Sequence, residues 1–234
     1  MSKKLLRLFG ILCFISLMVS CEKETSVENG FTPAPGNNNG GNTNDVCKSC
    51  AYVPWCDSTS YTFIDTTSTG AATSTSSLSL LSDTTIAGVV YTKSLIDGGY
   101  TYHNCTNGVS TVITYNATTT GGSTVTEFKT TLLKENDPVG STWTDVYNNN
   151  GTNVDYKYTI MAKSINRTVL GVNYADVIQV HLTVSTTVPI LGTVVASEGD
   201  NYYARGIGMI ESSSYNGTTG LLQQHRVLQA YHIP

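Results

Sequence analysis

The clearest structural signal in this chain is a two-residue alternation of apolar and polar side chains. In the run 177–184, Ile178, Val180 and Leu182 fall on one face, and the residues between them fall on the other. Successive side chains of a β-strand point to opposite sides of a sheet, so this pattern predicts a strand with one buried face. A second run of the same kind covers 156–163.

These two runs predict a β-hairpin joined across 166–171. The chain holds 14 Tyr and 21 Gly, which favour strands and turns. No segment shows convincing helical periodicity, although 73–82 is ambiguous. Short polar turns favour antiparallel connections, so we predict one all-β domain over 47–234 with the form of a curved sheet, a half-barrel or a sandwich. Further strands are expected at 61–65, 85–93, 99–105, 109–115, 125–133, 142–147, 202–211 and 221–233.

Two heptapeptides that lie 83 residues apart match each other register for register. Residues 85–91 read TIAGVVY, and residues 168–174 read TVLGVNY. An internal duplication would produce this match and would imply two similar halves within one domain. Common turn chemistry in a Thr-rich and Gly-rich chain would also produce it. The sequence leaves both explanations open.

The first 21 residues have the pattern of an export signal. A basic start is followed by an apolar run at 8–19, by Ser20 and by Cys21. This run is too short to span a bilayer, which needs about 20 residues, so we expect a cleaved secretory signal over 1–20. Residues 17–21, LMVSC, resemble a bacterial lipobox. The resemblance implies that cleavage occurs before Cys21 and that this cysteine is lipidated.

The segment that follows Cys21 is predicted to be a flexible tether. Up to residue 46 it is rich in Asn, Gly and Pro and lacks apolar periodicity, and a random coil of this length reaches roughly 25–30 Å. Its first residues, Glu22, Lys23 and Glu24, resemble the charged segment with which Bacteroidota lipoproteins reach the outer leaflet of the outer membrane. We therefore expect an outer-membrane protein that is anchored by acyl chains through 21–46 and exposed at the cell surface.

Four cysteines lie beyond the lipid anchor: Cys47, Cys50, Cys56 and Cys105. An even number in an exported chain predicts two disulfides, and three connectivities are open. In each of them Cys105 pairs with one of the other three and closes a loop of about 50–60 residues. A zinc site that includes His103 and a thioredoxin-like redox motif are weaker alternatives, because the surroundings are oxidising and neither a second C-x2-C motif nor a βαβ pattern is present.

The charge of the chain excludes one large class of partners. Charged residues make up 13% of the sequence, and beyond the export signal 17 acidic residues outnumber ten basic ones. Such a chain lacks the basic surface that nucleic-acid binding needs. The sequence also holds no zinc-protease, nucleotide-binding or serine-hydrolase motif. We therefore expect no metal, no cofactor and no catalytic site encoded in one local segment.

The most distinctive segment of the predicted domain is 202–210, YYARGIGMI. Together with the segment 138–143 and the cysteine-rich start, it resembles uncharacterised Bacteroidota lipoproteins of the outer membrane and cell surface. The resemblance covers most of 47–215 and implies a lipoprotein. It brings no established reaction with it.

Within this segment we expect Gly206 and Gly208 to share one face of a strand and to leave a strip without side chains. Such a strip accepts an aromatic ring, for which Trp143 is the candidate, or lets a ligand approach the backbone. Arg205 would lie on the opposite face as a solvent-exposed charge or an anion contact. Tyr203 completes this candidate ligand-binding set.

These features predict a non-enzymatic surface lipoprotein with a binding or structural role. Tyrosines on strands offer amphipathic contact area that suits a glycan, another envelope ligand or an envelope protein. One alternative is a carrier of lipids or lipoproteins, which requires an open apolar concavity lined by Ile178, Val180 and Leu182. A second alternative is a hydrolase with dispersed catalytic residues, whose signature would be histidines and carboxylates gathered in one cleft.

Overall fold

The computed structural model describes residues 47, 50–118, 124–149, 152–188 and 192–234, so the predicted signal, Cys21 and the tether lie outside the described residues. The described part is a single antiparallel sheet, which confirms the all-β prediction. In that part of the chain there is no helix of the length and hydropathy that a membrane crossing would need. The strands are β1 (Thr59–Thr67), β2 (Gly70–Ile86), β3 (Val89–Ile96), β4 (Gly99–Thr106), β5 (Val109–Thr118), β6 (Thr124–Lys134), β7 (Thr142–Asn149), β8 (Thr152–Val169), β9 (Val172–Val188), β10 (Gly192–Ala204), β11 (Gly208–Asn216) and β12 (Leu222–His232).

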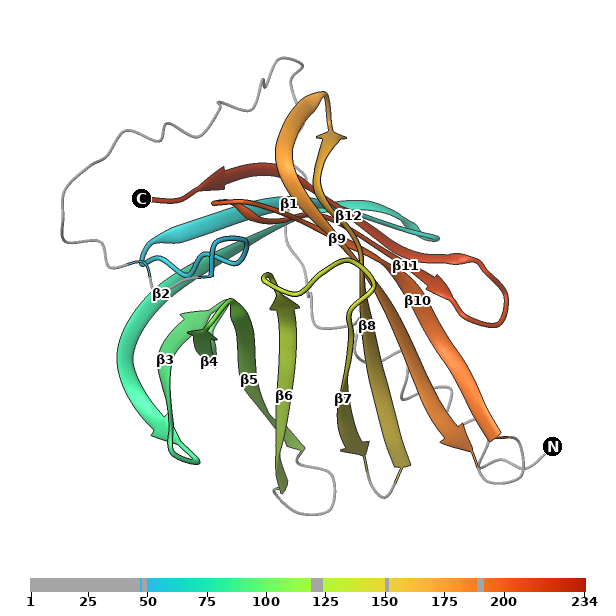
Figure 1. The fold of residues 1–234 in the computed structure, drawn as a ribbon, viewed down its shortest axis with the longest axis horizontal. Coiled ribbons are helices and arrows are strands. Elements are labelled where there is room, and N and C mark those ends of the chain that lie inside the picture. Colours follow the sequence, from blue (N-terminus) through green and yellow to red (C-terminus); the bar gives the residue numbers. More distant parts are fainter. Residues whose placement is uncertain (1–46, 48–49, 119–123, 150–151, 189–191) are drawn as a thin grey trace. The chain divides into compact units, whose positions relative to one another are not determined.

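The strands follow one another as a meander that divides into two halves of six. The order in the sheet is β6-β5-β4-β3-β2-β1-β12-β11-β10-β9-β8-β7 (Figure 1). The strands β1 and β12 therefore join the halves at the centre, and β6 and β7 form the two edges. Consecutive strands are neighbours everywhere except at the pair β6 and β7, as the short turns of the sequence predict.

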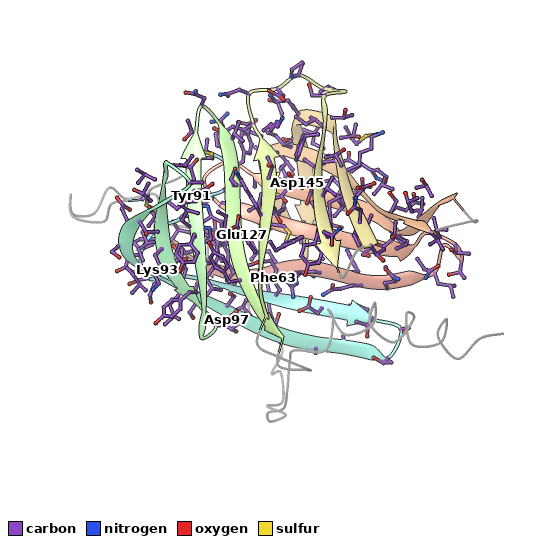
Figure 2. The ribbon with its side chains drawn as sticks, turned by 90° about the horizontal axis from the view of Figure 1, so that it is seen from below. Phe63, Tyr91, Lys93, Asp97, Glu127 and Asp145 are labelled. Atoms are coloured by element: carbon purple, nitrogen blue, oxygen red, sulfur yellow. A yellow bond between two sulfur atoms is a disulfide. The ribbon has the colours of Figure 1, made fainter. Side chains whose placement is uncertain are left out.

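The sheet curls until its edge strands face each other, and we call this junction the β6–β7 seam. Across it, side chains of β7 bind the backbone of β6. The N–H of Thr131 donates to Asp145 Oδ2 at 2.6 Å, and Trp143 Nε1 donates to the Thr131 carbonyl at 2.9 Å. Also across the seam, the ring of Phe128 on β6 packs edge-on against that of Tyr147 on β7, with centroids 5.1 Å apart. Figure 2 shows Asp145 on β7. Of the architectures left open by the sequence, the nearly closed curved sheet is the one present.

Two-residue turns join the second strand to the third in each half. Ala87 and Gly88 connect β2 to β3 with φ values of 48° and 80°, and Leu170 and Gly171 connect β8 to β9 with φ values of 49° and 82°. Turns with positive φ at both central residues match the twist of paired strands. The two matching heptapeptides therefore occupy equivalent positions in the two halves.

These turns also correct two predicted boundaries, and the structure resolves one ambiguous segment. The segment 85–93 is not one strand, because the chain reverses at Ala87 and Gly88. The connection predicted at 166–171 is wrong, because β8 continues to Val169 and only two residues turn. The ambiguous segment 73–82 belongs to β2. A non-glycine residue at positive φ, such as Ala87, carries little sequence signal for a turn, which explains the first error.

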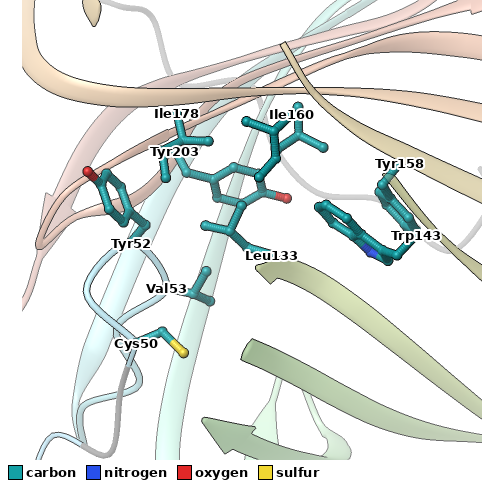
Figure 3. Packing of buried hydrophobic residues seen from close by; sticks show 10 residues of the cluster. Cys50, Tyr52, Val53, Leu133, Trp143, Tyr158, Ile160, Ile178 and Tyr203 are labelled. Carbon is teal, nitrogen blue, oxygen red and sulfur yellow. The ribbon is translucent and has the colours of Figure 1, made fainter. Parts of the chain in front are cut away.

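The main apolar core packs residues of β6 to β10 against the N-terminal segment 50–56 (Figure 3). Ile178 and Val180 are fully buried in it and Leu182 packs against it, which confirms the apolar face predicted from the alternation. The same packing contradicts the carrier alternative, because the side chains that were to line an open concavity are enclosed by other side chains. The buried members of this core are Cys50, Tyr52, Val53, Leu133, Trp143, Tyr158, Ile160, Ile178, Val180 and Tyr203.

Two disulfides constrain the N-terminal segment, one within the segment and one that ties it to β4. Cys47 pairs with Cys56, and Cys50 pairs with Cys105 on β4 across a sequence separation of 55 residues. The predicted pairing of Cys105 with one of the three earlier cysteines is confirmed, and its partner is Cys50. Because all four thiols are bonded to one another, the zinc and redox alternatives are wrong for these cysteines.

Candidate functional site

The turn end of the β8–β9 hairpin bends out of line with the rest of β8 and β9 and lies over β10 and β11. The pairing of β8 with β9 shifts register at three points between Ile160 and Arg167, and Ser164 and Asp176 have positive φ values of 53° and 52°. Extra residues of this kind bend a strand. Arg167 on β8 therefore contacts residues of β10 and β11, although β9 separates β8 from β10 in the sheet.

A second buried cluster holds this hairpin end in place. Val169 and Tyr174 from the hairpin belong to it together with Tyr202 and Ala204 of β10 and Leu228 of β12. Apolar burial is the largest favourable term in packing of this kind. The cluster therefore fixes the hairpin end, and with it the position of Arg167.

Arg167 and Glu211 form a two-bond ion pair at the centre of the site. Arg167 Nε donates to Glu211 Oε2 at 2.7 Å, and a terminal guanidinium nitrogen donates to Oε1 at 2.8 Å. The guanidinium carbon also lies 4.1 Å from the centroid of the Tyr202 ring. Paired hydrogen bonds of this geometry hold both groups in fixed orientation.

Two histidines flank this pair, each bound to a carboxylate. His225 Nε2 lies 3.0 Å from Glu211 Oε1, and His181 Nδ1 lies 3.0 Å from Asp200 Oδ1. The backbone N–H of Asp200 donates to Ser213 Oγ at 3.3 Å. Two imidazoles and two carboxylates thus meet on neighbouring strands, although they are dispersed in the sequence.

Except for His181, these groups line a pocket of about 330 Å³, which we call the Arg167 pocket. Its walls combine one basic, two acidic and one imidazole side chain with two tyrosine rings. Among the described residues, no group of three or more His, Cys, Asp or Glu is arranged to hold a metal ion. The lining residues are Arg167, Asp200, Tyr202, Glu211, Ser213, Tyr215, Leu222 and His225.

The electrostatics of the pocket keep Glu211 ionised. Burial by itself would raise the pKa of Glu211, but hydrogen bonds from Arg167 and His225 outweigh it, so the pKa of this carboxyl lies below its ordinary value. The hydrogen bond to Glu211 in turn raises the pKa of Arg167. Burial raises the pKa of Tyr202, against the opposing effect of the Arg167 charge. The pair is therefore charged and mutually neutralised at neutral pH.

The segment predicted as one strand at 202–211 is a hairpin, so its candidate residues separate. Tyr203 ends in the main core, whereas Arg205 and Gly206 form the turn between β10 and β11. Gly206 has φ 74°, and its N–H donates to the carbonyl of Ala51 at 2.6 Å. The prediction that Gly206 and Gly208 share a strand face is therefore wrong.

Arg205 is an exposed residue of this turn, as expected for a surface charge, and it is paired. It forms an ion pair with Asp176, and it also donates to the Tyr52 hydroxyl at 3.1 Å. Tyr52 donates to Asp176 Oδ1 at 2.7 Å. These contacts fasten the turn and the β8–β9 hairpin to the disulfide-bonded segment, outside the Arg167 pocket.

Trp143 does not fill a glycine strip. Its ring stacks on Tyr158 with centroids 5.2 Å apart, next to the β6–β7 seam. The ring beside Gly208 is that of Tyr61, whose hydroxyl would lie 3.3 Å from a Cβ at that position and donates to the Ile207 carbonyl at 2.8 Å. An aromatic ring does lie beside Gly208, but it belongs to Tyr61 and not to Trp143, which was expected from the sequence.

The sequence prediction missed the residues that line the Arg167 pocket. Arg167 lay in a predicted loop, and Glu211 closed a predicted strand 44 residues later. Their meeting depends on the bend of the β8–β9 hairpin, which bulges produce and which no residue spacing announces. The alternation in 177–184 did place His181, which binds the pocket residue Asp200, on the face opposite the core. This was the one sequence signal that pointed toward the site.

No protein-family model and no curated protein matches this chain. Two solved structures do. A protein of Parabacteroides distasonis described as a lipoprotein is 14% identical, with a TM-score of 0.47, over 78% of this chain and 99% of its own. An exported protein of Bacteroides fragilis with a YmcC-like fold is 10% identical, with a TM-score of 0.45, over 79% of this chain and 100% of its own.

Proposed function

We propose that the protein is a lipid-anchored, non-enzymatic binding module of the outer membrane and that its Arg167 pocket binds a neutral glycan. The location is supported by the export signal and by the lipobox-like segment that ends at Cys21. The binding role is supported by the geometry of the pocket. The two parts of the proposal are independent and are tested separately.

The observation that carries the binding role is the combination of aromatic rings with a paired arginine. Tyr202 and Tyr215 line the pocket, and tyrosine rings offer an apolar face beside a hydrogen-bonding hydroxyl. Because Glu211 is paired with Arg167, the described residues of the pocket offer no free positive charge to an anionic ligand, and Asp200 is the remaining acidic group. A ligand with apolar faces, many hydroxyl groups and no net charge matches such a surface.

Asp200 provides the specific contact in this scheme. Among the described residues its carboxylate uses Oδ1 to bind His181, so Oδ2 is able to accept a hydrogen bond from a sugar hydroxyl. A hydrogen bond to an ionised acceptor is stronger than one between neutral groups. Asp200 therefore orients a sugar ring that packs against Tyr215.

The test is binding of neutral oligosaccharides to the full-length lipidated protein in detergent. A glycan microarray that carries glucose-, galactose- and mannose-containing oligosaccharides identifies the best binders, and calorimetric titration measures their affinity. We expect Asp200→Asn and Tyr215→Ala each to weaken binding about tenfold, the factor that corresponds to about 1.4 kcal/mol.

Tyr100→Ala is the matched control for Tyr215→Ala. Both rings are exposed, by 55% and 40%, but Tyr100 lies on β4 outside the pocket. The proposal requires unchanged affinity in this control. Failure of every neutral oligosaccharide to bind, or equal binding by the wild type and both pocket variants, would overturn it.

A hydrolase is a second candidate function, because the pocket gathers the groups that this alternative requires. Ser213 lies opposite His225 in the β11–β12 ladder, and His225 is bound to Glu211. A serine, an imidazole and a carboxylate are the parts of a nucleophilic site. Binding stays the leading function because, in the part of the chain that the structure describes, Ser213 Oγ makes no hydrogen bond to His225, and Glu211 is already bound by Arg167.

Turnover of p-nitrophenyl acetate and p-nitrophenyl butyrate tests this second function. A hydrolase should lose its activity in Ser213→Ala and keep it in Ser79→Ala, which removes an exposed serine on β2. Turnover that is equal in the wild type and in Ser213→Ala rules the serine mechanism out.

A further inference from the structure

Four buried polar atoms in the half formed by the N-terminal segment and β1 to β5 have no hydrogen-bond partner among the described residues. They are Trp55 Nε1, Thr59 Oγ1, His103 Nδ1 and Ser110 Oγ. Thr59, His103 and Ser110 are each at most 3% exposed. Native proteins pair nearly all such atoms, because an unpaired buried donor or acceptor loses its bonds to solvent.

Three of these side chains belong to one region of the interior. The rings of Trp55 and His103 stack with centroids 3.6 Å apart. Ser110 pairs across the ladder with Cys105, two residues from His103, so Ser110 and His103 project from the same face of neighbouring strands. Thr59 begins β1, which lies three strands from β4 in the sheet, and it is not part of this group.

The chemistry of these groups restricts what binds among them. His103 Nε2 is already engaged by Ser94 Oγ at 2.6 Å and Thr101 Oγ1 at 2.7 Å. Burial lowers the pKa of His103 to about 3, so the ring is neutral at physiological pH. The indole N–H of Trp55 only donates, whereas the hydroxyls both donate and accept. The occupant must therefore be small, uncharged and able to donate and accept.

We propose that ordered water molecules occupy a buried site formed by Trp55, His103 and Ser110. Water accepts from the indole N–H and bonds to the Ser110 hydroxyl and the imidazole at the same time, with the two to four protein partners that buried waters need. An anion would lack a positive counter-charge here, because His103 is neutral. One half of the sheet therefore encloses a hydrated polar site, whereas the core around Ile178 and Val180 is apolar.

Thermal unfolding of Ser110→Ala separates a hydrated site from a dry one. If water binds Ser110 Oγ, removal of the hydroxyl breaks a hydrogen bond and lowers Tm by about 2–4 °C. If the hydroxyl is dry and unpaired, alanine relieves its desolvation penalty, and Tm stays equal or rises. Ser79→Ala, at an exposed serine of β2, is the matched control and should leave Tm unchanged.

A second measurement uses the unmodified protein and does not depend on a variant. A crystal structure at high resolution should show water oxygens within hydrogen-bond distance of at least two of the three atoms Trp55 Nε1, His103 Nδ1 and Ser110 Oγ. Crystals soaked in bromide should show no anomalous peak at the site. A bromide peak there, or the absence of ordered water together with an unchanged Tm in Ser110→Ala, overturns the inference.

Discussion

Glu211 is the residue on which the charges of the Arg167 pocket depend. Its carboxylate is largely buried and accepts hydrogen bonds from both Arg167 and His225. These bonds keep its pKa below the ordinary value of 4.5. A carboxyl whose pKa is lower in the folded than in the unfolded chain stabilises the fold at pH values above the unfolded pKa. This contribution to the free energy of unfolding is lost as the pH falls through the folded pKa.

The stability of the wild type should therefore depend on acid pH through Glu211. We expect the Tm advantage of the wild type over Glu211→Gln to be complete at pH 7 and to shrink as the pH falls below about 4.5. Melting curves from pH 7 to pH 3, recorded by circular dichroism, measure this difference. Glu198→Gln, at an exposed position of β10, is the control. Parallel Tm curves for the wild type and Glu211→Gln would contradict the prediction.

At the scale of elements, the β8–β9 hairpin end is held by two ion pairs and one apolar cluster. Arg167 binds Glu211 on β11, Asp176 binds Arg205 in the β10–β11 turn, and Val169 and Tyr174 are buried against β10 and β12. Ladder bonds within the hairpin do not fix this docking, because they join β8 only to β9. Loss of the Arg167–Glu211 pair should therefore loosen the docked end and leave the rest of the sheet intact.

Hydrogen exchange of Arg167→Ala tests this separation. We expect backbone amides of 165–176 to exchange about tenfold faster, because a hydrogen bond to a charged group contributes about 1.5 kcal/mol or more. Amides of β3 to β5 should keep their wild-type rates. Arg226→Ala, which removes an ion pair with Asp65 elsewhere in the sheet, should not affect 165–176. Unchanged exchange in the hairpin would show that the apolar cluster and the Arg205–Asp176 pair hold it without Arg167.

The two disulfides should contribute unequally to stability. Cys50 and Cys105 close a loop of 55 residues, whereas Cys47 and Cys56 close one of nine. In the chain-entropy model the longer loop contributes about 4 kcal/mol and the shorter one about 2.5 kcal/mol. Urea unfolding of the two double-alanine variants measures both values. A greater loss from the 47–56 variant would contradict the model for this protein.

At the scale of the whole molecule, the proposed lipid anchor would hold the β domain at the membrane. In the proposed scheme Cys21 carries the lipid and 22–46 is the tether. We expect Cys21→Ser to move the protein from the membrane fraction to the soluble fraction and to remove the mass of the acyl chains. Fractionation and mass spectrometry of the intact protein measure both effects. Membrane association that survives the substitution would exclude Cys21 as the anchor.

Much of the fold was accessible from the sequence because strand alternation is a local signal. The run 177–184 lies within β9, and its apolar face is the one that packs in the core. Turns were harder, because Ala87 and Arg205 are not typical turn residues, and both predicted strands were drawn through them. The Arg167 pocket was inaccessible, since a bend in β8 creates it and spacing does not encode that bend.

The β6–β7 seam has a consequence for how the molecule comes apart. Every other pair of neighbouring strands is joined by a ladder of backbone hydrogen bonds, whereas at the seam the side chains of Asp145 and Trp143 bind the backbone of Thr131. Because no ladder joins these two edges in the described part of the chain, we expect thermal opening to begin at the seam and to proceed from β6 and β7 toward β1 and β12.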